Sequence, residues 1–473
     1  MTIDELYREQ TERRPDALAV VCGAERLTFA ALATRTGRLA ARLRGLGVAP
    51  ERRVALVVDR SVELAIGTLA IIEAGGAFVP IDPRAGADRI RALASAAGAE
   101  LTVTQRSLRH VAGEPGPTVV MIDDGDARGG LPAPPPPLPP PAGSSTRLRY
   151  VMHTSGSTAA PRAVEVEHAS SVDQVQSLAT DLGFGPEDRH LHTAALGFTL
   201  AVRQLLVPIC LGGAVVIARE DELRHPLALL RAAKRAGVTV LDLVPSVLRA
   251  VIAALRALPA SARAAVLPDG LRLVLTAGER LTAELVEAWW SLAGAGARVI
   301  NLYGASEVGG SVAWREVCAA DLGRTTIPIG RPRSGTTVEL LEPSSPSIAP
   351  VADGAIGELC VAGPAVARGY VRPEAGDRAR FVDPTEEAPR LAGTAVGLIG
   401  DPARRSRWFR TGDQPFPRPH GRRAGVSQDA VRPPLVHPLH VGHHRAAEVH
   451  RARHGRHAAP AAQGAPPALR SRS

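Results

Sequence analysis

Lysine is almost absent from this chain of 473 residues. Lys234 is the only lysine among 56 lysine and arginine residues. Arginine must therefore supply nearly every cationic contact, as a planar fork of donors instead of a point charge. The G-x-x-x-x-G-K-[ST] spacing of a Walker phosphate loop is also absent, which excludes that type of nucleotide site.

Cysteine is scarce as well. The four cysteines, at positions 22, 210, 318 and 360, are far apart and fit no metal or disulfide spacing. The first residues, MTIDELYREQTERRPD, are charged, which is not typical of a secretory signal. We therefore expect a protein of the reducing cytoplasm.

An uninterrupted apolar run is also missing. The most apolar stretch, Leu64–Ile81, is interrupted by Glu73, by glycines and by Pro80. It predicts a buried helix, a turn and a strand, and not a membrane span. A hydrophobic content of 45% with 22% charged residues is typical of a globular chain. Its 473 residues are enough for two or more domains.

The positive charge is concentrated at one end. Ten arginines against Asp429 and Glu448 give residues 414–473 a charge of +8, of a total of +9. The body of the chain is therefore nearly neutral. Its charge does not favour nucleic acid as a partner, because a nucleic-acid-binding domain carries its basic patch on the fold.

Helical and strand patterns alternate along most of the chain. Leu27–Leu46 repeats apolar residues at three- and four-residue spacing and predicts an amphipathic helix. Short apolar runs predict buried strands, namely Val54–Val58, Phe78–Ile81, Val119–Ile122, Val215–Ile217, Val238–Leu243, Leu271–Leu275 and Val299–Leu302. The β–α–β order predicts an α/β fold of helix-covered, mostly parallel sheets.

The texture changes in the last third of the chain. After about residue 330, TTVELLEP and GELCVAG are rich in strand-forming residues and predict a small β subdomain. We therefore expect an α/β core over residues 1–330, a β-rich part over 331–413 and a tail over 414–473. The prolines of Pro132–Pro141 predict an exposed connection within the core.

The tail lacks any sustained apolar period and holds eight of the fourteen histidines. Four of them, His437, His440, His443 and His444, can be imagined as a metal site. Its Pro/His/Arg-rich composition instead favours a disordered segment. The abrupt change of composition also resembles translation in a shifted reading frame.

A polar loop follows an apolar strand end in Tyr150–Val164. Its hydroxyl and glycine residues, Thr154, Ser155, Gly156, Ser157 and Thr158, can hold phosphate oxygens through hydroxyls and backbone N–H groups. Arg162 can offset the phosphate charge with its fork of donors. Taken alone, the segment fits a solvated turn equally well.

Further stretches change that balance. TSGSTAAPRAV resembles the phosphate loop of the adenylate-forming (AMP-binding) superfamily, especially the adenylation domains of nonribosomal peptide synthetases. Matching stretches follow in the expected order, namely LTFAAL (27–32), EAGGAFVPIDP (73–83), NLYGASE (301–307), GELCVAGPAVARGY (357–370) and FRTGD (409–413). The resemblance covers residues 1 to about 413.

The resemblance implies a ligase that works in two steps. An amino acid or a related carboxylic acid attacks ATP to give an acyl-adenylate, with Mg²⁺ present, and the acyl group then passes to a phosphopantetheine thiol. That thiol belongs to a separate carrier protein or to another synthetase module. An acyl- or aryl-CoA ligase is an alternative. The tail lacks the family's hinge and its C-terminal lysine. A second alternative is therefore a truncated, catalytically impaired relative that binds ATP or a partner synthetase.

The resemblance also assigns roles to individual residues. Catalytic roles fall on Thr154, Ser306 and Glu307, and Glu307 is the metal ligand. Contacts to the nucleotide fall on Thr154, Ser155, Gly156, Ser157, Thr158, Arg162, Asn301, Tyr303, Gly304 and Asp413. Tyr303 is expected to stack on adenine, and Asp413 to accept hydrogen bonds from the ribose hydroxyls.

The substrate pocket is expected to be unusual. Its positions by the same alignment are Thr199, Leu200, Arg203, Asp242, Leu275, Ala277, Leu302, Gly310 and Ser311. Family members usually grip the substrate's α-ammonium group with an aspartate where this chain has Thr199, and a neutral hydroxyl cannot offset a buried charge. A hydroxy, keto, aryl or β-amino acid is therefore favoured, or an amine that another group holds. Arg203 and Asp242 either bind a polar substrate group or neutralise each other.

Overall fold

The computed structural model describes residues 1–112, 118–124, 144–154, 162–341, 356–373, 381–382, 396–399, 409–411 and 426–427. Contacts divide the chain into two units, Met1–Pro434 and Leu435–Ser473, and only the first contains described residues. The proline stretch 132–141 and nearly all of the tail lie outside the described residues. The expected boundaries at residues 330 and 413 stay predictions.

A nine-stranded sheet forms one half of the core. Its strands in spatial order are β15 (Arg331–Pro332), β14 (Gly310–Glu316), β13 (Arg298–Ala305), β12 (Leu273–Thr276), β11 (Val240–Leu243), β9 (Arg189–His192), β10 (Ala214–Ile217), β1 (Leu18–Cys22) and β2 (Glu25–Thr28). The strands from β13 to β1 run parallel, and β15, β14 and β2 close the edges in antiparallel pairing.

A seven-stranded sheet forms the other half. Its order is β18 (Gly369–Tyr370), β8 (Arg162–Glu167), β7 (Leu148–Thr154), β4 (Ala77–Pro80), β3 (Arg53–Val57), β5 (Leu101–Thr104) and β6 (Thr118–Met121). The strands from β7 to β6 are parallel, whereas β8 returns antiparallel beside β7. This hairpin places the two ends of the predicted phosphate loop side by side.

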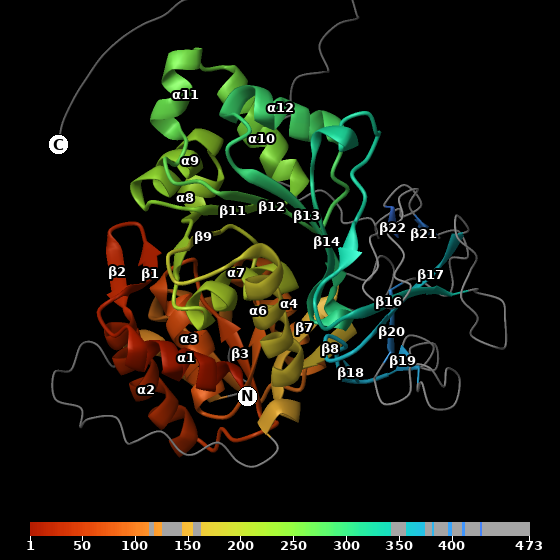
Figure 1. Cartoon of the computed structure of the whole chain (residues 1–473). Helices are drawn as coiled ribbons and strands as arrows, with labels where there is room; N and C mark the ends of the chain where they lie inside the picture. The colour runs from red at the N-terminus through yellow and green to blue at the C-terminus, as the bar shows by residue number, and fades with distance from the viewer. Residues whose placement is uncertain are drawn as a thin grey trace, which may run out of the picture. The chain divides into compact units, whose positions relative to one another are not determined.

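Helices cover both sheets (Figure 1). They are α1 (Ile3–Arg13), α2 (Phe29–Gly45), α3 (Val62–Glu73), α4 (Ala87–Ala96), α5 (Arg109–Ala112), α6 (His168–Leu182), α7 (Thr199–Cys210), α8 (Glu220–Leu223), α9 (Pro226–Arg235), α10 (Pro245–Arg256), α11 (Ala260–Val266) and α12 (Ala283–Ala293). Helix α2 begins two residues later than its apolar period predicts. The reason is that Leu27 belongs to β2 and the Thr28 hydroxyl caps the helix by accepting the N–H of Ala31.

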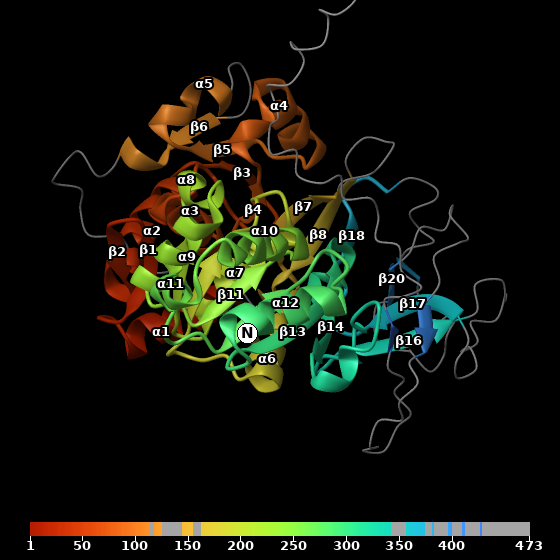
Figure 2. The ribbon, with the colours of Figure 1, turned by 90° about the horizontal axis from the view of Figure 1, so that it is seen from above.

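The largest apolar cluster lies between the two sheets. It joins side chains of α3, α6 and α7 to strand residues of both sheets, such as Leu56 of β3, Met152 of β7 and Leu275 of β12. Helix α3 is apolar on nearly all sides and is buried accordingly. Smaller clusters pack α9, α10 and α12 on β11–β13 and α4 on the opposite face of β3 and β4 (Figures 1 and 2).

A third sheet contains the strand-rich segments. In it β17 (Ile356–Ala362) pairs with β16 (Thr337–Leu341), β20 (Val396–Ile399) and β21 (Phe409–Thr411), while β19 (Phe381–Val382) and β22 (Val426–Ser427) lie outside these. The predicted α/β fold of parallel-rich, helix-covered sheets with additional β structure is confirmed. Across the described ranges, no helix combines the length and the apolar character that crossing a membrane requires.

Candidate active site

The predicted pocket residues lie on elements that meet in the nine-stranded sheet. Asp242 in β11 is the register partner of Leu275 in β12, and Ala277 directly follows that strand. Leu302 lies one strand further on, in β13, where it is buried. Parallel pairing therefore brings together residues from three segments that are separated in the sequence.

Helix α7 carries three further predicted pocket residues. Thr199 is its first residue, Leu200 is half-buried beside it, and Arg203 is one turn further along. The guanidinium of Arg203 meets the carboxylate of Asp242 through two contacts, Nη2 to Oδ1 at 3.0 Å and Nη1 to Oδ2 at 2.9 Å. Both side chains are almost fully buried, so the two charges neutralise each other inside the protein.

A glutamine of the same helix adds to these contacts. Gln204 donates from Nε2 to the backbone oxygen of Asp242 at 2.9 Å, and its Oε1 accepts the backbone N–H groups of Thr193 and Ala194. Burial raises the pKa of Asp242, while Arg203 opposes the rise. The polar groups here thus engage one another. We refer to Thr193, Arg203, Gln204 and Asp242 as the α7–β11 wall.

Two predicted residues from distant segments touch each other. The hydroxyl oxygens of Thr199 and Ser306 are 2.8 Å apart, and either can donate. Thr199 begins α7, while Ser306 follows the end of β13 in a short 3₁₀ turn over Ser306–Val308. The predicted substrate pocket and the predicted phosphate contact are therefore adjacent.

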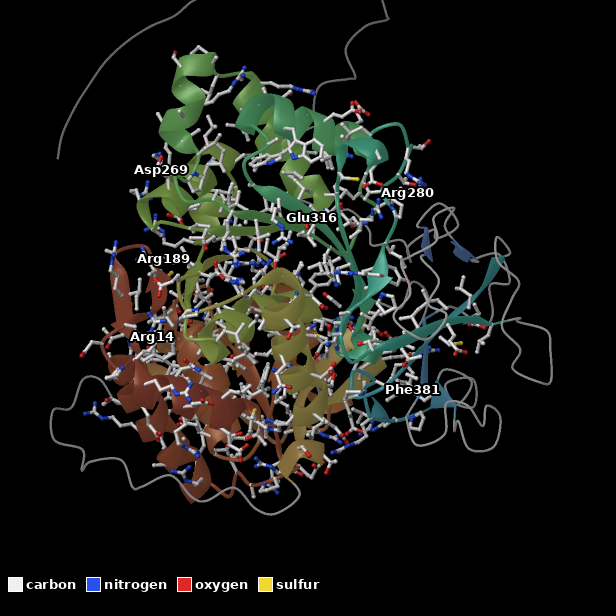
Figure 3. The ribbon with its side chains drawn as sticks, viewed as in Figure 1. Arg14, Arg189, Asp269, Arg280, Glu316 and Phe381 are labelled. Atoms are coloured by element: carbon white, nitrogen blue, oxygen red, sulfur yellow. The ribbon has the colours of Figure 1, made fainter. Side chains whose placement is uncertain are left out.

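Glu307 belongs to a cluster of side chains that come from separate strands and from the turn after β13. The hydroxyl of Tyr370 in β18 donates to Oε1 of Glu307 at 2.8 Å. The guanidinium of Arg162 lies over the Tyr370 ring, 5.6 Å from its centroid. The Phe381 ring, labelled in Figure 3, packs edge-on against the same tyrosine at 5.4 Å. Tyr370 thus contacts both Glu307, the predicted metal ligand, and Arg162, the arginine predicted to bind phosphate.

Tyr370 has no role in the sequence-based assignment. It ends the GELCVAGPAVARGY stretch, but a tyrosine at the end of a strand is ordinary in sequence. The structure shows its position because β18 pairs antiparallel with β8, opposite Val164. The backbone N–H of Ala367 also donates to the backbone oxygen of Glu307 at 2.9 Å, so this segment holds Glu307 from two sides.

The predicted phosphate loop is described only at its two ends. Thr154 is the last residue of β7 and Arg162 the first residue of β8, and the two are register partners. Both side chains are half-buried. The predicted contacts Ser155, Gly156, Ser157 and Thr158 lie outside the described residues, as does Asp413.

The predicted adenine contacts lie along β13. Asn301 is fully buried and donates from Nδ2 to the backbone oxygens of Ile327 and Pro328, at 3.2 and 2.9 Å. Its Oδ1 has no hydrogen-bond partner among the described residues. Burial raises the pKa of Tyr303, and the Glu307 carboxylate raises it further, so the phenol stays neutral.

Glycines allow β13 and β14 to approach closely. A Cβ on Gly304 would lie 1.8 Å from the backbone oxygen of Gly310, so no larger residue fits there. Gly310 has a φ of +130° and pairs with Ala305, while Ser311 pairs with Gly304. The predicted pocket positions Gly310 and Ser311 thus lie in β14, directly beside the end of β13 that leads into Ser306.

Comparisons with known proteins identify the family of the chain. The model of the AMP-binding enzyme family matches residues 7–371. The chain is 31% identical over 400 residues to tyrocidine synthase 3 of Brevibacillus parabrevis, covering 85% of this chain and 6% of that protein. It is 32% identical over 374 residues to gramicidin S synthase 2 of Aneurinibacillus migulanus, covering 79% and 8%. The chain therefore spans only a small part of these curated relatives.

Solved structures of nonribosomal peptide synthetases have a similar fold. The nonribosomal peptide synthetase FmoA3 superposes with a TM-score of 0.76 at 27% identity, over 87% of this chain and 41% of that one. The N-terminal subdomain of Klebsiella oxytoca NpsA, in complex with 3-hydroxybenzoyl-AMSN, gives a TM-score of 0.74 at 21% identity. That match covers 90% of this chain and 99% of the other, and shares the fold. The resemblance found in the motifs is confirmed, and the chain belongs to the AMP-binding enzyme family.

Proposed function

We propose that this chain joins ATP and a carboxylic acid as an acyl-adenylate in nonribosomal peptide biosynthesis. A carboxylate oxygen of the acid attacks the α-phosphorus, the bond to the bridging oxygen breaks, and pyrophosphate leaves. A phosphopantetheine thiol of a carrier protein then displaces AMP from the acyl carbon. The names of the similar synthases and the family support this proposal, as does the geometry described above.

The contact between Thr199 and Ser306 carries the proposal. The resemblance gives Thr199 to the acid and Ser306 to the α-phosphate, and their hydroxyls are 2.8 Å apart. Acyl-adenylate formation requires the carboxylate and the α-phosphorus to meet. Two reactants held in contact by neighbouring hydroxyls lose less entropy on reaching the transition state. The adjacency is what the proposed chemistry needs.

The residues beside Ser306 fit a magnesium ion. Glu307 offers a carboxylate, and the hydroxyl that Oε1 accepts from Tyr370 holds that carboxylate in place. Mg²⁺ in nucleotide sites is commonly held by one or two carboxylates together with phosphate oxygens. Such an ion would supply charge neutralisation for the phosphates. Arg162 would support the β- and γ-phosphates from the other side.

The purine would lie against β13. The Oδ1 of Asn301 is an acceptor without a partner among the described residues, and the adenine amino group is a donor. Tyr303 is neutral and would stack on the ring. The loop residues from Ser155 to Thr158 would contact phosphate, and Asp413 would contact the ribose.

The acid is proposed to lack a free α-ammonium group. Thr199 offers only a hydroxyl, and that hydroxyl already touches Ser306. Asp242, which carries the one carboxylate among the predicted pocket residues, is engaged twice by Arg203. A buried ammonium needs a counter-charge, so a hydroxy, keto or aryl acid fits better, or a β-amino acid whose amine lies elsewhere. ATP and reduced thiols place the reaction in the cytoplasm.

Exchange of labelled pyrophosphate into ATP tests the proposal. The whole chain is assayed with Mg²⁺ over a panel of amino, hydroxy, keto and aryl acids, with ATP binding measured separately. We expect exchange that depends on one class of acid. Ser306→Ala should lower the exchange rate about 10²-fold, because it removes a preorganised donor from the phosphate.

Ser291→Ala is the matched control. Ser291 is exposed on α12 and its hydroxyl donates to the Ala288 backbone oxygen, so this variant should keep the full rate. Binding of ATP without exchange for any acid would contradict the proposed reaction. An equal loss of exchange in both serine variants would contradict the role given to Ser306.

A further inference from the structure

A row of polar side chains lies on the face of α6 that meets the β13–β14 hairpin. Ser170, Gln174, Ser177 and Asp181 follow one another at spacings of four, three and four residues, which places them on one side of the helix. The first three are buried, with exposed fractions of 1%, 5% and 4%. Buried polar groups need partners, so the contacts of each one matter.

Three members of the row have partners. The hydroxyl of Ser170 donates to the backbone oxygen of Ala365 at 2.9 Å. Ser177 accepts from the buried guanidinium of Arg333, and Asp181 accepts from the indole N–H of Trp314 at 3.2 Å. These contacts fasten α6 to β14 through Trp314, and to the segments that contain Ala365 and Arg333. The row is therefore built into the fold and is not a solvated face.

Gln174 is the exception. Its Nε2 is buried and has no hydrogen-bond partner among the described residues. A buried amide without a partner costs free energy, whereas an apolar residue of similar size would not. Rotation about the terminal bond lets the same amide present either an N–H donor or its carbonyl oxygen.

Gly310 fixes where this amide lies. A Cβ built on Gly310 would be 2.2 Å from Nε2 of Gln174, so the amide fills the space that a side chain at position 310 would need. Gly310 pairs with Ala305, the residue before Ser306, and Ser306 touches Thr199. The amide thus lies against a predicted pocket position, one strand away from the residue that precedes Ser306. We refer to Ser170, Gln174, Gly309 and Gly310 as the α6–β14 wall.

We propose that Gln174 determines specificity by hydrogen-bonding a neutral polar group, a hydroxyl or a carbonyl, on the side chain of the acid. This inference rests on the proposed function. The group is neutral because the amide is neutral and because Arg203 and Asp242 already balance each other. An acid with a purely apolar side chain leaves the amide unpaired and is rejected.

The test uses acyl-sulfamoyladenosines in matched pairs that differ by one terminal hydroxyl. Suitable pairs are butanoyl with 4-hydroxybutanoyl, hexanoyl with 6-hydroxyhexanoyl, and phenylacetyl with 4-hydroxyphenylacetyl, each measured by calorimetry on the whole chain. We expect at least one hydroxylated member to bind tenfold or more tightly than its partner. Gln174→Met should abolish that preference and leave the affinity of the apolar partner unchanged or stronger.

Two further variants sharpen the result. Gln174→Asn keeps the amide but withdraws it by one methylene, and it should lose the preference as well. Gln176→Met is the matched control, because Gln176 is exposed on the same helix and should keep the preference. Without ligand, Gln174→Met should melt at the same temperature as the parent or higher, since it removes an unpaired buried amide.

The outcomes separate the two proposals. If probes bind but no pair shows a preference, or the preference survives in Gln174→Met, the inference fails and the proposed function stands. If Gln174→Met lowers the melting temperature and weakens both members of a pair equally, Gln174 is structural and the inference also fails. If neither ATP nor any probe binds, the proposed function fails and the inference fails with it.

Discussion

The α7–β11 wall of the candidate pocket contains a complete ion pair, whereas the α6–β14 wall contains a neutral amide. Arg203 and Asp242 are as deeply buried as Gln174, yet their opposite charges meet through one hydrogen bond and one further close contact, while the amide nitrogen meets no described partner. Charge inside a protein must be balanced by the protein itself, because the cost of an unpaired buried ion is large. An unpaired neutral group costs much less and can be left for a ligand.

The two walls also differ in how firmly their side chains are held. Gln204 ties the α7–β11 wall to the Thr193–Ala194 backbone, and Arg60 donates to the oxygens of those same two residues at 2.8 and 2.6 Å. This wall is therefore a rigid part of the core. The α6–β14 wall is fastened by the contacts of Ser170, whereas the side-chain nitrogen of Gln174, which lies against the predicted pocket position Gly310, has no partner among the described residues.

Breaking the ion pair should have the largest effect on stability. Arg203→Met removes the cation and leaves the Asp242 carboxyl buried alone, which should lower the free energy of unfolding by about 3–5 kcal/mol. Chemical denaturation measures the change. The double variant Arg203→Met with Asp242→Leu removes both charges and should recover most of the loss.

An exposed ion pair is the control for this change. Arg298 and Glu316, the latter labelled in Figure 3, meet twice at 3.0 and 2.8 Å on the surface. Arg298→Met should cost less than about 1 kcal/mol, because water screens the pair. If Arg203→Met costs no more than Arg298→Met, burial does not distinguish the pair, and the contrast between the walls fails.

The next largest effect should appear on acidification. His192 ends β9 beside the α7–β11 wall, is fully buried and lies 3.4 Å from Arg60 through Nδ1. Burial lowers its pKa to about 3, and Arg60 contributes to the lowering. In the unfolded chain the pKa returns to about 6.5. Between pH 6.5 and 3 the unfolded chain therefore binds the extra proton, and stability falls as the pH falls.

The size of this effect follows from the linkage of proton binding to unfolding. His192 should contribute a slope of up to about 1.4 kcal/mol per pH unit below pH 6.5, or roughly 2 kcal/mol between pH 7 and pH 5. Denaturation at several pH values should show a shallower slope for His192→Gln than for the parent. His225→Gln, at an exposed position, should keep the parent slope. Equal slopes in all three proteins would contradict a neutral His192.

Much of the fold was predictable because buried parallel strands are short apolar runs. Val54–Val58 and Val215–Ile217 are recognisable without any knowledge of their neighbours, and both form parallel strands. The antiparallel strands β8 and β14, each next to a two-residue edge strand, were not predicted. Their sequences, RAVEVE and GSVAWRE, mix charged and apolar residues, and their antiparallel pairing depends on turns and tertiary contacts.

The candidate site shows the same division. Thr199, Ser306 and Glu307 were predictable because they lie in recognisable motifs. Gln174 was not, since a glutamine among the serines and aspartates of α6 looks like any solvated helix residue. Its importance depends on a glycine 136 positions away, Gly310, that admits its amide. Only the packing of α6 on β14 brings the two together.

The smallest effect is expected outside both walls, at the only lysine. Lys234 of α9 donates to the backbone oxygens of Ala264 and Leu267, at 3.2 and 3.0 Å, and pairs with Asp269, labelled in Figure 3. These contacts are largely solvent-exposed, so Lys234→Met should lower the free energy of unfolding by less than about 1 kcal/mol. The exchange of pyrophosphate that depends on the acid should be unchanged, because the Lys234 side chain contacts α11 and the residues after it, and none of the predicted site residues that the structure describes. A tenfold loss of exchange at unchanged stability would instead give this lysine a direct part in the reaction.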